Sequence, residues 1–335
     1  MSNPTTNALE AESESRKIWG LEQPALGLSL GGAVPGDRAL GRLRWVEQAE
    51  TLGLHSVWLP EMHFERGVCP APLLELASFA PATHRVRLGT TSLLLPLHPP
   101  EELAAEIAAL DQLSGGRALI GLGRGFQKRM LEAFRVAPAE KRDRFDETLD
   151  RMLALWSDGH RKGDAFATCQ RPHPPLAVAA FGPKGLAQAA RRGLPYLASP
   201  VETLVQIEEN QQRHREGLPD PARKPLSLVL RTVFVSESER ELEAIRARLE
   251  SELPARRAGL PEAIHAAIDS PLDARTVIGT PAAVIERLAR DRARLGIDLL
   301  IVRPQLAGIE RSVLERSLCW LAETVWPAVV SRRRE

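Results

Sequence analysis

Short apolar runs alternate with longer amphipathic stretches along most of the chain. The apolar runs are rich in Leu, Val, Ile and Ala, and Gly, Pro or polar residues bound them, as is typical of strands. They predict strands over Ala25–Leu30, Ser56–Leu59, Val86–Leu95, Arg117–Gly123, Leu176–Ala180, Tyr196–Ser199, Leu226–Val235 and Asp298–Val302. Runs such as Leu176–Ala180 are apolar at every position, as expected of parallel strands that helices cover on both faces.

The stretches between these runs have the periodicity of helices. In residues 37–52, apolar side chains recur every three or four positions, and Asp37 and Gly53 suit the two ends of a helix. Similar patterns predict helices over Pro70–Ala80, Glu101–Leu113, Ala139–Trp156, Gly185–Arg192, Val201–Arg215, Thr280–Leu295 and Ser312–Val329, with another from Glu237. The alternation gives about eight βα units, which predicts a single (β/α)8 TIM barrel with insertions. A doubly wound sheet would need a linker near the middle of the chain, and the sequence shows no clear one.

The same pattern sets the boundaries of the domain at residues 24–330. Residues 1–23 are polar and acidic, and predict a disordered leader rather than a signal peptide. Residues 251–276 fit the pattern poorly and predict an insertion near the end of the barrel. Residues 331–335 include three consecutive arginines and predict a short, solvated basic tail.

Composition narrows the class of protein. A chain of 335 residues with 44% hydrophobic and 26% charged residues is typical of a globular protein, and a net charge of +1 favours no nucleic-acid partner. No apolar run approaches the roughly 20 residues that span a bilayer, so we expect no membrane segment. Cys69, Cys169 and Cys319 lack the spacing of metal ligands, which predicts no metal site and reduced thiols in the cytoplasm.

Candidate chemistry follows from the position of active sites in such barrels, which lie at the carboxyl ends of the strands. The second strand runs into Glu61, Met62 and His63, so a carboxylate and an imidazole stand where they could transfer protons. A loop histidine with an ordinary structural partner explains the same residues. The third strand carries the hydroxyls of Thr91 and Ser92.

A possible phosphate site is spread over three segments. Arg124 follows two glycines at the end of the fourth strand, and Arg142 lies near the start of the next helix. The fifth strand runs through Gly182, Lys184 and Gly185 into a helix, whose N-terminus favours anions. The sequence therefore predicts a clamp around one phosphate. It is not a dinucleotide fingerprint, because Phe126 stands where that motif has its third glycine.

Several of these segments resemble the bacterial luciferase-like monooxygenases, a family of flavin-dependent oxidoreductases. The resemblance covers about residues 25–329. It rests on Leu54–Phe64, Val86–Thr90, Leu95–Pro99, Leu110–Arg117, Gly121–Gly125, Arg144–Glu147 and Gly279–Pro281. It implies a barrel that binds reduced FMN from an NAD(P)H-dependent flavin reductase. Oxygen then forms a flavin C4a-peroxide, which oxygenates a small organic substrate.

The resemblance also implies roles for individual residues. Arg124 and Arg142 would hold the flavin phosphate together with the chain at Gly182, Lys184 and Gly185. Thr91 and Ser92 would lie along the flavin ring, and Met62 and Ser199 are further candidates for binding the cofactor. The family often has a non-proline cis peptide on the third strand, and Thr91–Ser92 is the candidate here. His63, with Glu61, is the candidate for catalysis.

One departure from the family leaves alternatives open. The luciferase catalytic subunit has a catalytic histidine where this chain has Met62. Either His63 or a loop residue supplies the proton, or the chemistry differs, or the chain is a non-catalytic flavin-binding partner subunit. Relatives that use the deazaflavin F420 for hydride transfer share the barrel. A hydrolase is disfavoured because no Gly-x-Ser-x-Gly motif is present.

The family resemblance further implies a homodimer. The predicted helix Glu101–Leu113 carries a row of small residues that would permit close approach of a second helix: Ala104, Ala105, Ala108 and Ala109. Packing within the barrel wall explains the same row equally well.

Overall fold

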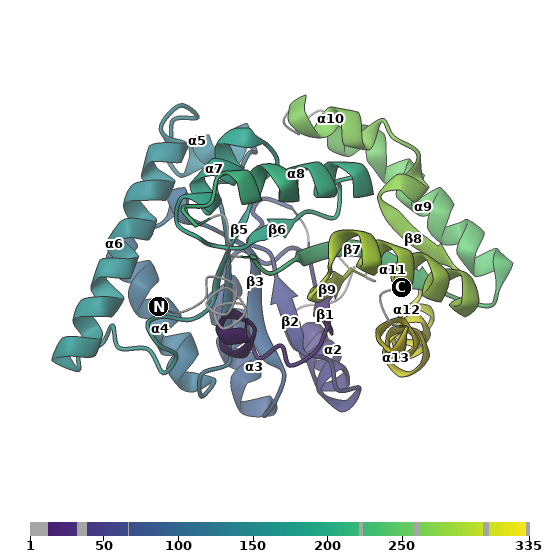
Figure 1. Ribbon diagram of the computed structural model, residues 1–335, viewed down its shortest axis with the longest axis horizontal. Coiled ribbons are helices and arrows are strands. Elements are labelled where there is room, and N and C mark those ends of the chain that lie inside the picture. The colour runs from purple at the N-terminus through teal and green to yellow at the C-terminus, as the bar shows by residue number, and fades with distance from the viewer. Residues whose placement is uncertain are drawn as a thin grey trace, which may run out of the picture.

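The computed structural model describes residues 13–31, 39–65, 67–220, 224–257, 262–303 and 308–332, without the side chains of 39, 40, 253–257, 262 and 263. Eight parallel strands form a closed barrel, because the last of them pairs with the first (Figure 1). They are β1 (Ala25–Ser29), β2 (Ser56–Leu59), β3 (Arg87–Leu94), β4 (Ala118–Gly123), β5 (Leu176–Ala179), β6 (Tyr196–Ala198), β7 (Leu228–Val235) and β9 (Leu299–Val302). The predicted (β/α)8 barrel and its eight strands are confirmed.

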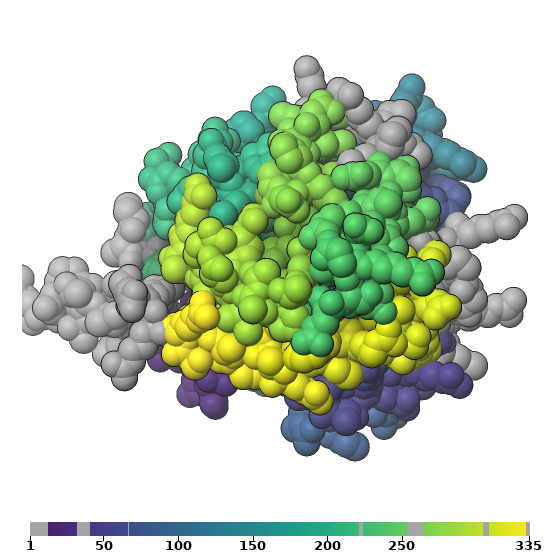
Figure 2. All heavy atoms as spheres, turned by 90° about the vertical axis from the view of Figure 1, so that its right-hand side faces the viewer, coloured from purple at the N-terminus to yellow at the C-terminus, as the bar shows by residue number. Residues whose placement is uncertain are grey.

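Helices surround this barrel and bury their apolar faces against it (Figure 1). Those that follow the predicted pattern are α2 (Ala39–Thr51), α3 (Pro72–Phe79), α4 (Pro100–Leu113), α6 (Lys141–Lys162), α7 (Pro183–Ala190), α8 (Leu204–Glu216), α11 (Pro281–Leu295), α12 (Arg311–Cys319) and α13 (Trp326–Ser331). A π-helical turn, Trp320–Val325, joins the last two. Figure 2 shows this C-terminal part as a continuous yellow band across one side of the molecule. The short helix α5 (Lys128–Ala133) was not predicted.

The predicted insertion at 251–276 contains regular structure. Helix α9 (Glu239–Arg257) enters it, and α10 (Glu262–Ile268) lies within it. A ninth strand, β8 (Thr276–Gly279), pairs with the second half of β7, whose first half pairs with β9. The strand lies outside the closed barrel and pairs with β7 alone, so the pattern of repeating βα units did not point to it.

The amino-terminal segment closes the interior of the barrel. Residues 13–18 are helical, and Trp19 and Leu21 are only 4% and 1% exposed. Both pack with Trp58 and other side chains that fill the barrel. A ring nitrogen of His55, just before β2, lies 3.0 Å from the carbonyl oxygen of Trp19. The predicted disorder is therefore wrong from residue 13 onwards, because two large apolar side chains gain burial there.

Other predictions concern the two ends of the chain and the membrane. Residues 1–12 of the predicted leader, and 333–335 of the predicted basic tail, lie outside the described residues. None of the helices in the described part of the chain is long and apolar enough to cross a membrane.

Candidate functional site

A cavity of about 540 Å³ opens at the carboxyl ends of the strands. Every strand of the barrel contributes a lining residue, either from within the strand or just after it: Ser29, Pro60, Thr91, Gly123, Ala179, Ala198, Leu230 and Arg303. The volume lies within the range of about 300–1,000 Å³ that is usual for cofactor and ligand sites. Ten of the eleven predicted site residues line this cavity: Glu61, Met62, Thr91, Ser92, Arg124, Arg142, Gly182, Lys184, Gly185 and Ser199.

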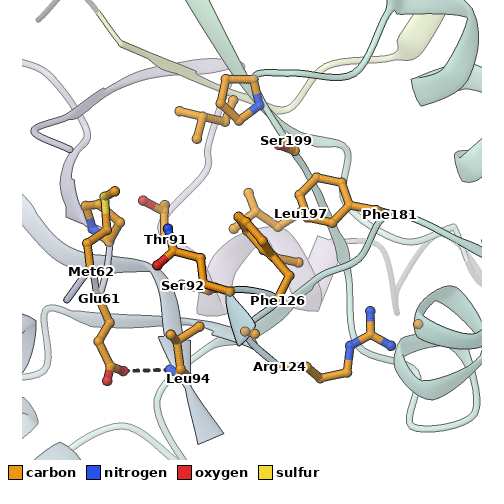
Figure 3. Close-up of a pocket in the computed structure, with 18 of the residues that line it drawn as sticks. Glu61, Met62, Thr91, Ser92, Leu94, Arg124, Phe126, Phe181, Leu197 and Ser199 are labelled. Atoms are coloured by element: carbon orange, nitrogen blue, oxygen red, sulfur yellow. Dashed lines mark hydrogen bonds between the residues drawn. The ribbon is translucent and has the colours of Figure 1, made fainter. Parts of the chain in front are cut away.

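The third strand is irregular where it borders the cavity (Figure 3). The Thr91–Ser92 peptide bond is cis, as predicted from the family resemblance. The pairing of β3 with β4 shifts register between Thr91 and Leu93. A β-carbon on Gly123 would overlap the hydroxyl of Ser92, so only glycine permits this approach of the two strands. The Thr91 hydroxyl is buried without a partner in the described structure.

The carboxylate of Glu61 holds this strand in place rather than facing the cavity. Its side chain is fully buried, and Oε2 accepts the backbone N–H of Leu94 at 2.7 Å. Figure 3 shows the carboxylate turned towards Leu94. Nε2 of His63 lies 2.8 Å from Oε1, and Nε2 of His98 lies 2.9 Å from the same oxygen. Burial tends to lower the pKa of His98, but Glu61 outweighs it and raises that pKa above its usual value.

His63 is the one predicted site residue that does not line the cavity. Its ring packs 4.8 Å from that of Phe134, and its Nε2 is engaged with Glu61. Successive side chains of an extended segment point to opposite sides, so Met62 faces the cavity and His63 faces away. The structure thus places Glu61 as a buried anchor of β3 and His63 as one of its two histidine partners, and the catalytic role predicted for the pair stays a prediction.

Three cations converge at the opposite end of the cavity. Arg124 and Arg142 were predicted there, and Lys141 joins them. Burial lowers the pKa of the Arg124 guanidinium, and the charge of Arg142 lowers it further. Burial likewise lowers the pKa of Lys141, followed by the charges of Arg124 and Arg142. Within the described part of the chain, none of the three forms an ion pair, so the cluster is suited to binding an anion.

The N-terminus of α7 completes this end of the cavity. Its N-cap residue is Gly182, and no side chain caps the helix. The first backbone N–H groups of a helix carry partial positive charge and favour anions. The guanidinium of Arg124 lies against Gly185, and its Nη1 donates to Gln188 Oε1 at 2.9 Å. The segments predicted to form a phosphate clamp therefore lie on one side of one cavity.

The remainder of the cavity is largely apolar. Phe126 and Phe181 meet edge to face, with ring centroids 6.5 Å apart, and Figure 3 shows both beside Leu197. Ser199 adds a polar group, and its backbone N–H donates to Glu202 at 2.6 Å. This chamber suits a flat apolar group that carries a phosphate at one end.

Sequence reasoning missed one member of the cation cluster, Lys141, and one polar neighbour of it, Gln188. Lys141 adjoins Arg142 at the start of α6, and its Nζ donates to the carbonyl of Gly125 at 3.3 Å. The position of Arg142 was a usable signal for Lys141. Gln188 lies on the buried side of α7 and had no sequence signal, because its partners come from other parts of the chain.

A family model and a curated relative both relate this chain to flavin-dependent monooxygenases. Residues 31–299 match the family model described as luciferase-like monooxygenase. The oxygenase component of the flavin-dependent trigonelline monooxygenase of Acinetobacter baylyi is 28% identical over 211 residues. That match spans 58% of this chain and 58% of the relative.

Solved structures share the fold. The oxygenating constituent of 3,6-diketocamphane monooxygenase from Pseudomonas putida, in complex with FMN, has a TM-score of 0.76 and 20% identity, covering 91% of this chain and 98% of that one. The coenzyme F420-dependent tetrahydromethanopterin reductase of Methanopyrus kandleri has a TM-score of 0.66 and 18% identity, covering 91% and 99%. At these identities the likeness concerns the fold alone.

Proposed function

Because the chain belongs to the family of luciferase-like monooxygenases, we propose that it is an FMN-dependent monooxygenase that uses reduced FMN and O2 to oxygenate a small organic substrate. The observation that carries this proposal is the cluster of Arg124, Lys141 and Arg142 beside the uncapped end of α7. Uncompensated cations at the end of an apolar chamber match a flavin mononucleotide, which joins a phosphate to a flat ring system.

The residues of the cavity divide between the two parts of the cofactor. The three cations, with the chain at Gly182, Lys184 and Gly185, would hold the phosphate. The ring system would lie along Thr91, Ser92, Met62 and Ser199, where the buried Thr91 hydroxyl lacks a partner in the described structure. When bound, reduced FMN would supply the electrons that activate O2.

The protein itself would position the reactants and exclude water. Phe126, Phe181 and Leu197 offer an apolar surface to the body of a substrate. The described lining residues include no histidine, since Met62 takes the place that faces the cavity. We therefore infer that this member does not use an imidazole for proton transfer at that position, and that Glu61 and His63 act by positioning β3.

Two alternatives use the same cavity. One is an F420-dependent oxidoreductase that transfers hydride, since the phosphate-binding end suits a deazaflavin cofactor as well. The other is a non-catalytic flavin-binding subunit, which the methionine at position 62 would suit. The intact cation cluster supports cofactor binding in all three cases.

One experiment separates these functions. The purified protein is titrated with FMN and F420 in parallel by calorimetry, and O2 uptake is then followed with the reduced cofactor and a panel of aldehydes, ketones and thioethers. FMN binding with product-coupled O2 uptake supports the proposal. Preferential F420 binding would replace it with the hydride-transfer function, and FMN binding without product from any member of a broad panel would favour a binding subunit.

We also propose two protein partners. The named oxygenase component among the relatives implies a separate flavin reductase as the source of reduced flavin. A second copy of the chain would pack on α3 and α4, where Leu74 and Leu113 are 74% and 66% exposed. Ala104 and Ala108 of the predicted alanine row are instead buried within the barrel wall. Light scattering should show a dimer that Leu113→Glu weakens.

A further inference from the structure

Gln188 lies between the cation cluster and the nearest carboxylate. Its Oε1 accepts a hydrogen bond from Nη1 of Arg124 at 2.9 Å. Its Nε2 donates to Oδ2 of Asp146 at 2.9 Å and to the backbone carbonyl of Arg142 at 3.2 Å. The residue is only 4% exposed. The side-chain amide thus separates Arg124 from Asp146 and engages both of them.

These partners fix the direction in which the amide points. An arginine has only donors and a carboxylate only acceptors. Turning the amide round would place its NH2 group against Arg124 and its oxygen against Asp146, and would lose all three hydrogen bonds. The carbonyl end of Gln188 therefore faces Arg124, and a buried amide with every group satisfied holds the guanidinium in place.

Asp146 is neutralised from its other side. Arg192 Nη1 pairs with its Oδ1 at 2.7 Å, and Arg191 pairs with Oδ2. Burial tends to raise the pKa of this carboxyl, but the hydrogen bonds from Arg191 and Gln188 and the charges of both arginines hold it below its usual value. The carboxylate of Asp146 therefore pairs directly with Arg191 and Arg192, and its charge acts on Arg124 only through space, across the Gln188 amide.

We propose that Gln188 is a positioning and specificity residue: as a neutral spacer, it keeps Arg124 uncompensated and aimed at the cavity, and so sets the preference for a phosphorylated flavin over its dephosphorylated form. This inference rests on the proposed FMN site. An acid at position 188 would pair with Arg124 directly and occupy the cation that the phosphate needs. An amide of the same size anchors the arginine without removing its charge.

The test compares FMN with riboflavin, which has the same ring but no phosphate. Gln188→Glu changes an amide into a carboxylate of nearly the same size. We expect its FMN dissociation constant to rise about tenfold to a hundredfold, since charge-assisted contacts are lost. Riboflavin affinity should stay within about twofold, which also reports that the ring site is folded. Gln212→Glu, on the exposed side of α8, makes the same change in net charge and should leave both affinities unaltered.

A second variant separates charge from anchoring. Gln188→Met removes the hydrogen bonds without adding a charge, and we expect FMN affinity to fall only about threefold. Should Gln188→Glu keep the parent's preference for FMN over riboflavin, or should Gln188→Met lose as much as Gln188→Glu, the spacer role is overturned while the FMN site stands. A parent protein that binds FMN and riboflavin equally would instead overturn the phosphate clamp and the spacer role together.

If Gln188→Glu fails to fold, Gln188→Met tests the spacer role alone, through the ratio of its FMN affinity to its riboflavin affinity. A loss of preference as large as that of Arg124→Ala would contradict the spacer role, and a small loss would support it.

Discussion

The guanidinium of Arg124 lies directly against the backbone of Gly185, so that a β-carbon at residue 185 would come within 2.7 Å of the central guanidinium carbon. Arg124 ends β4, and Gly185 belongs to the first turn of α7. The side chain that follows β4 thus contacts the backbone of α7 directly, with no side chain between them. The pairing brings a buried cation beside the positive end of a helix dipole, which is unfavourable unless an anion binds there.

A methyl group at this contact should displace the arginine. In Gly185→Ala we expect FMN affinity to fall about tenfold, because the guanidinium must move away from the phosphate position. Riboflavin affinity should change little, since the ring contacts lie elsewhere in the cavity. Parallel titrations of both ligands measure the effect. Equal losses for FMN and riboflavin would show that the substitution acts by distorting the whole cavity.

The anchor of the third strand should be needed for stability. Glu61→Ala leaves the Leu94 N–H without its acceptor and removes the shared partner of His63 and His98. We expect a loss of about 2–3 kcal/mol in the free energy of unfolding, measured by urea denaturation, because buried polar groups lose their partners. The exposed neighbour Glu65→Ala serves as control and should stay within about 0.5 kcal/mol. A Glu61→Ala protein as stable as its parent would contradict the anchoring role.

The Met62 side chain faces the cavity and the His63 side chain faces away from it, and pH profiles of turnover can test this difference. His63→Ala should leave the shape of the profile unchanged, because that ring faces Phe134 rather than the cavity. Met62→His would place an imidazole in the cavity, and we expect it to introduce a titration near pH 6.5, the ordinary pKa of histidine. If His63→Ala abolishes a titration step of the parent enzyme, His63 acts on the reaction after all.

Most of the fold could be predicted because its signals are local. The barrel strands are short runs such as Leu176–Ala179, buried on both sides and set between amphipathic helices, and this pattern is visible in the sequence. The strand β8 was not predicted, because it adds an edge to β7 outside the eight repeating βα units. The burial of Trp19 also depends on a partner surface that only the closed barrel provides.

The site was partly predictable for a similar reason. Strand ends meet at one face of a barrel, so Arg124 and the turn at Gly182 could be brought together from the sequence. The direction of a side chain in a loop could not, and His63 was therefore misplaced. The position of Gln188 beside Arg124 could not be predicted from the sequence, because its contacts depend on Asp146, which lies more than forty residues earlier in the chain.

The docking of the amino-terminal segment should depend on pH. Burial lowers the pKa of His55 to about 4, although its bond to the Trp19 carbonyl opposes the shift. The unfolded chain binds this proton below about pH 6.5, whereas the folded chain resists it until about pH 4. The contribution of neutral His55 to the free energy of unfolding should therefore be fully present above pH 6.5. It should fall as the pH drops, by on the order of 2 kcal/mol near pH 4.5.

Denaturant unfolding at several pH values checks this expectation. His55→Gln should flatten the decline between about pH 6.5 and pH 4, since the titrating ring is gone. His84→Gln, at an exposed position nearby, should keep the slope of the parent. A variant at position 55 that retains the full decline would assign the acid sensitivity to other groups.

The central claim is that Arg124, Lys141 and Arg142 form the phosphate site of a flavin cofactor. The most direct measurement is the ratio of FMN to riboflavin affinity in Arg124→Ala, with Arg144→Ala as control, because Arg144 follows on the same helix as Arg142 but pairs with Glu140 outside the cavity. We expect the parent to prefer FMN by at least about tenfold, and Arg124→Ala to lose most of this preference while Arg144→Ala keeps it. An unchanged ratio in Arg124→Ala would contradict the phosphate site and the function that depends on it.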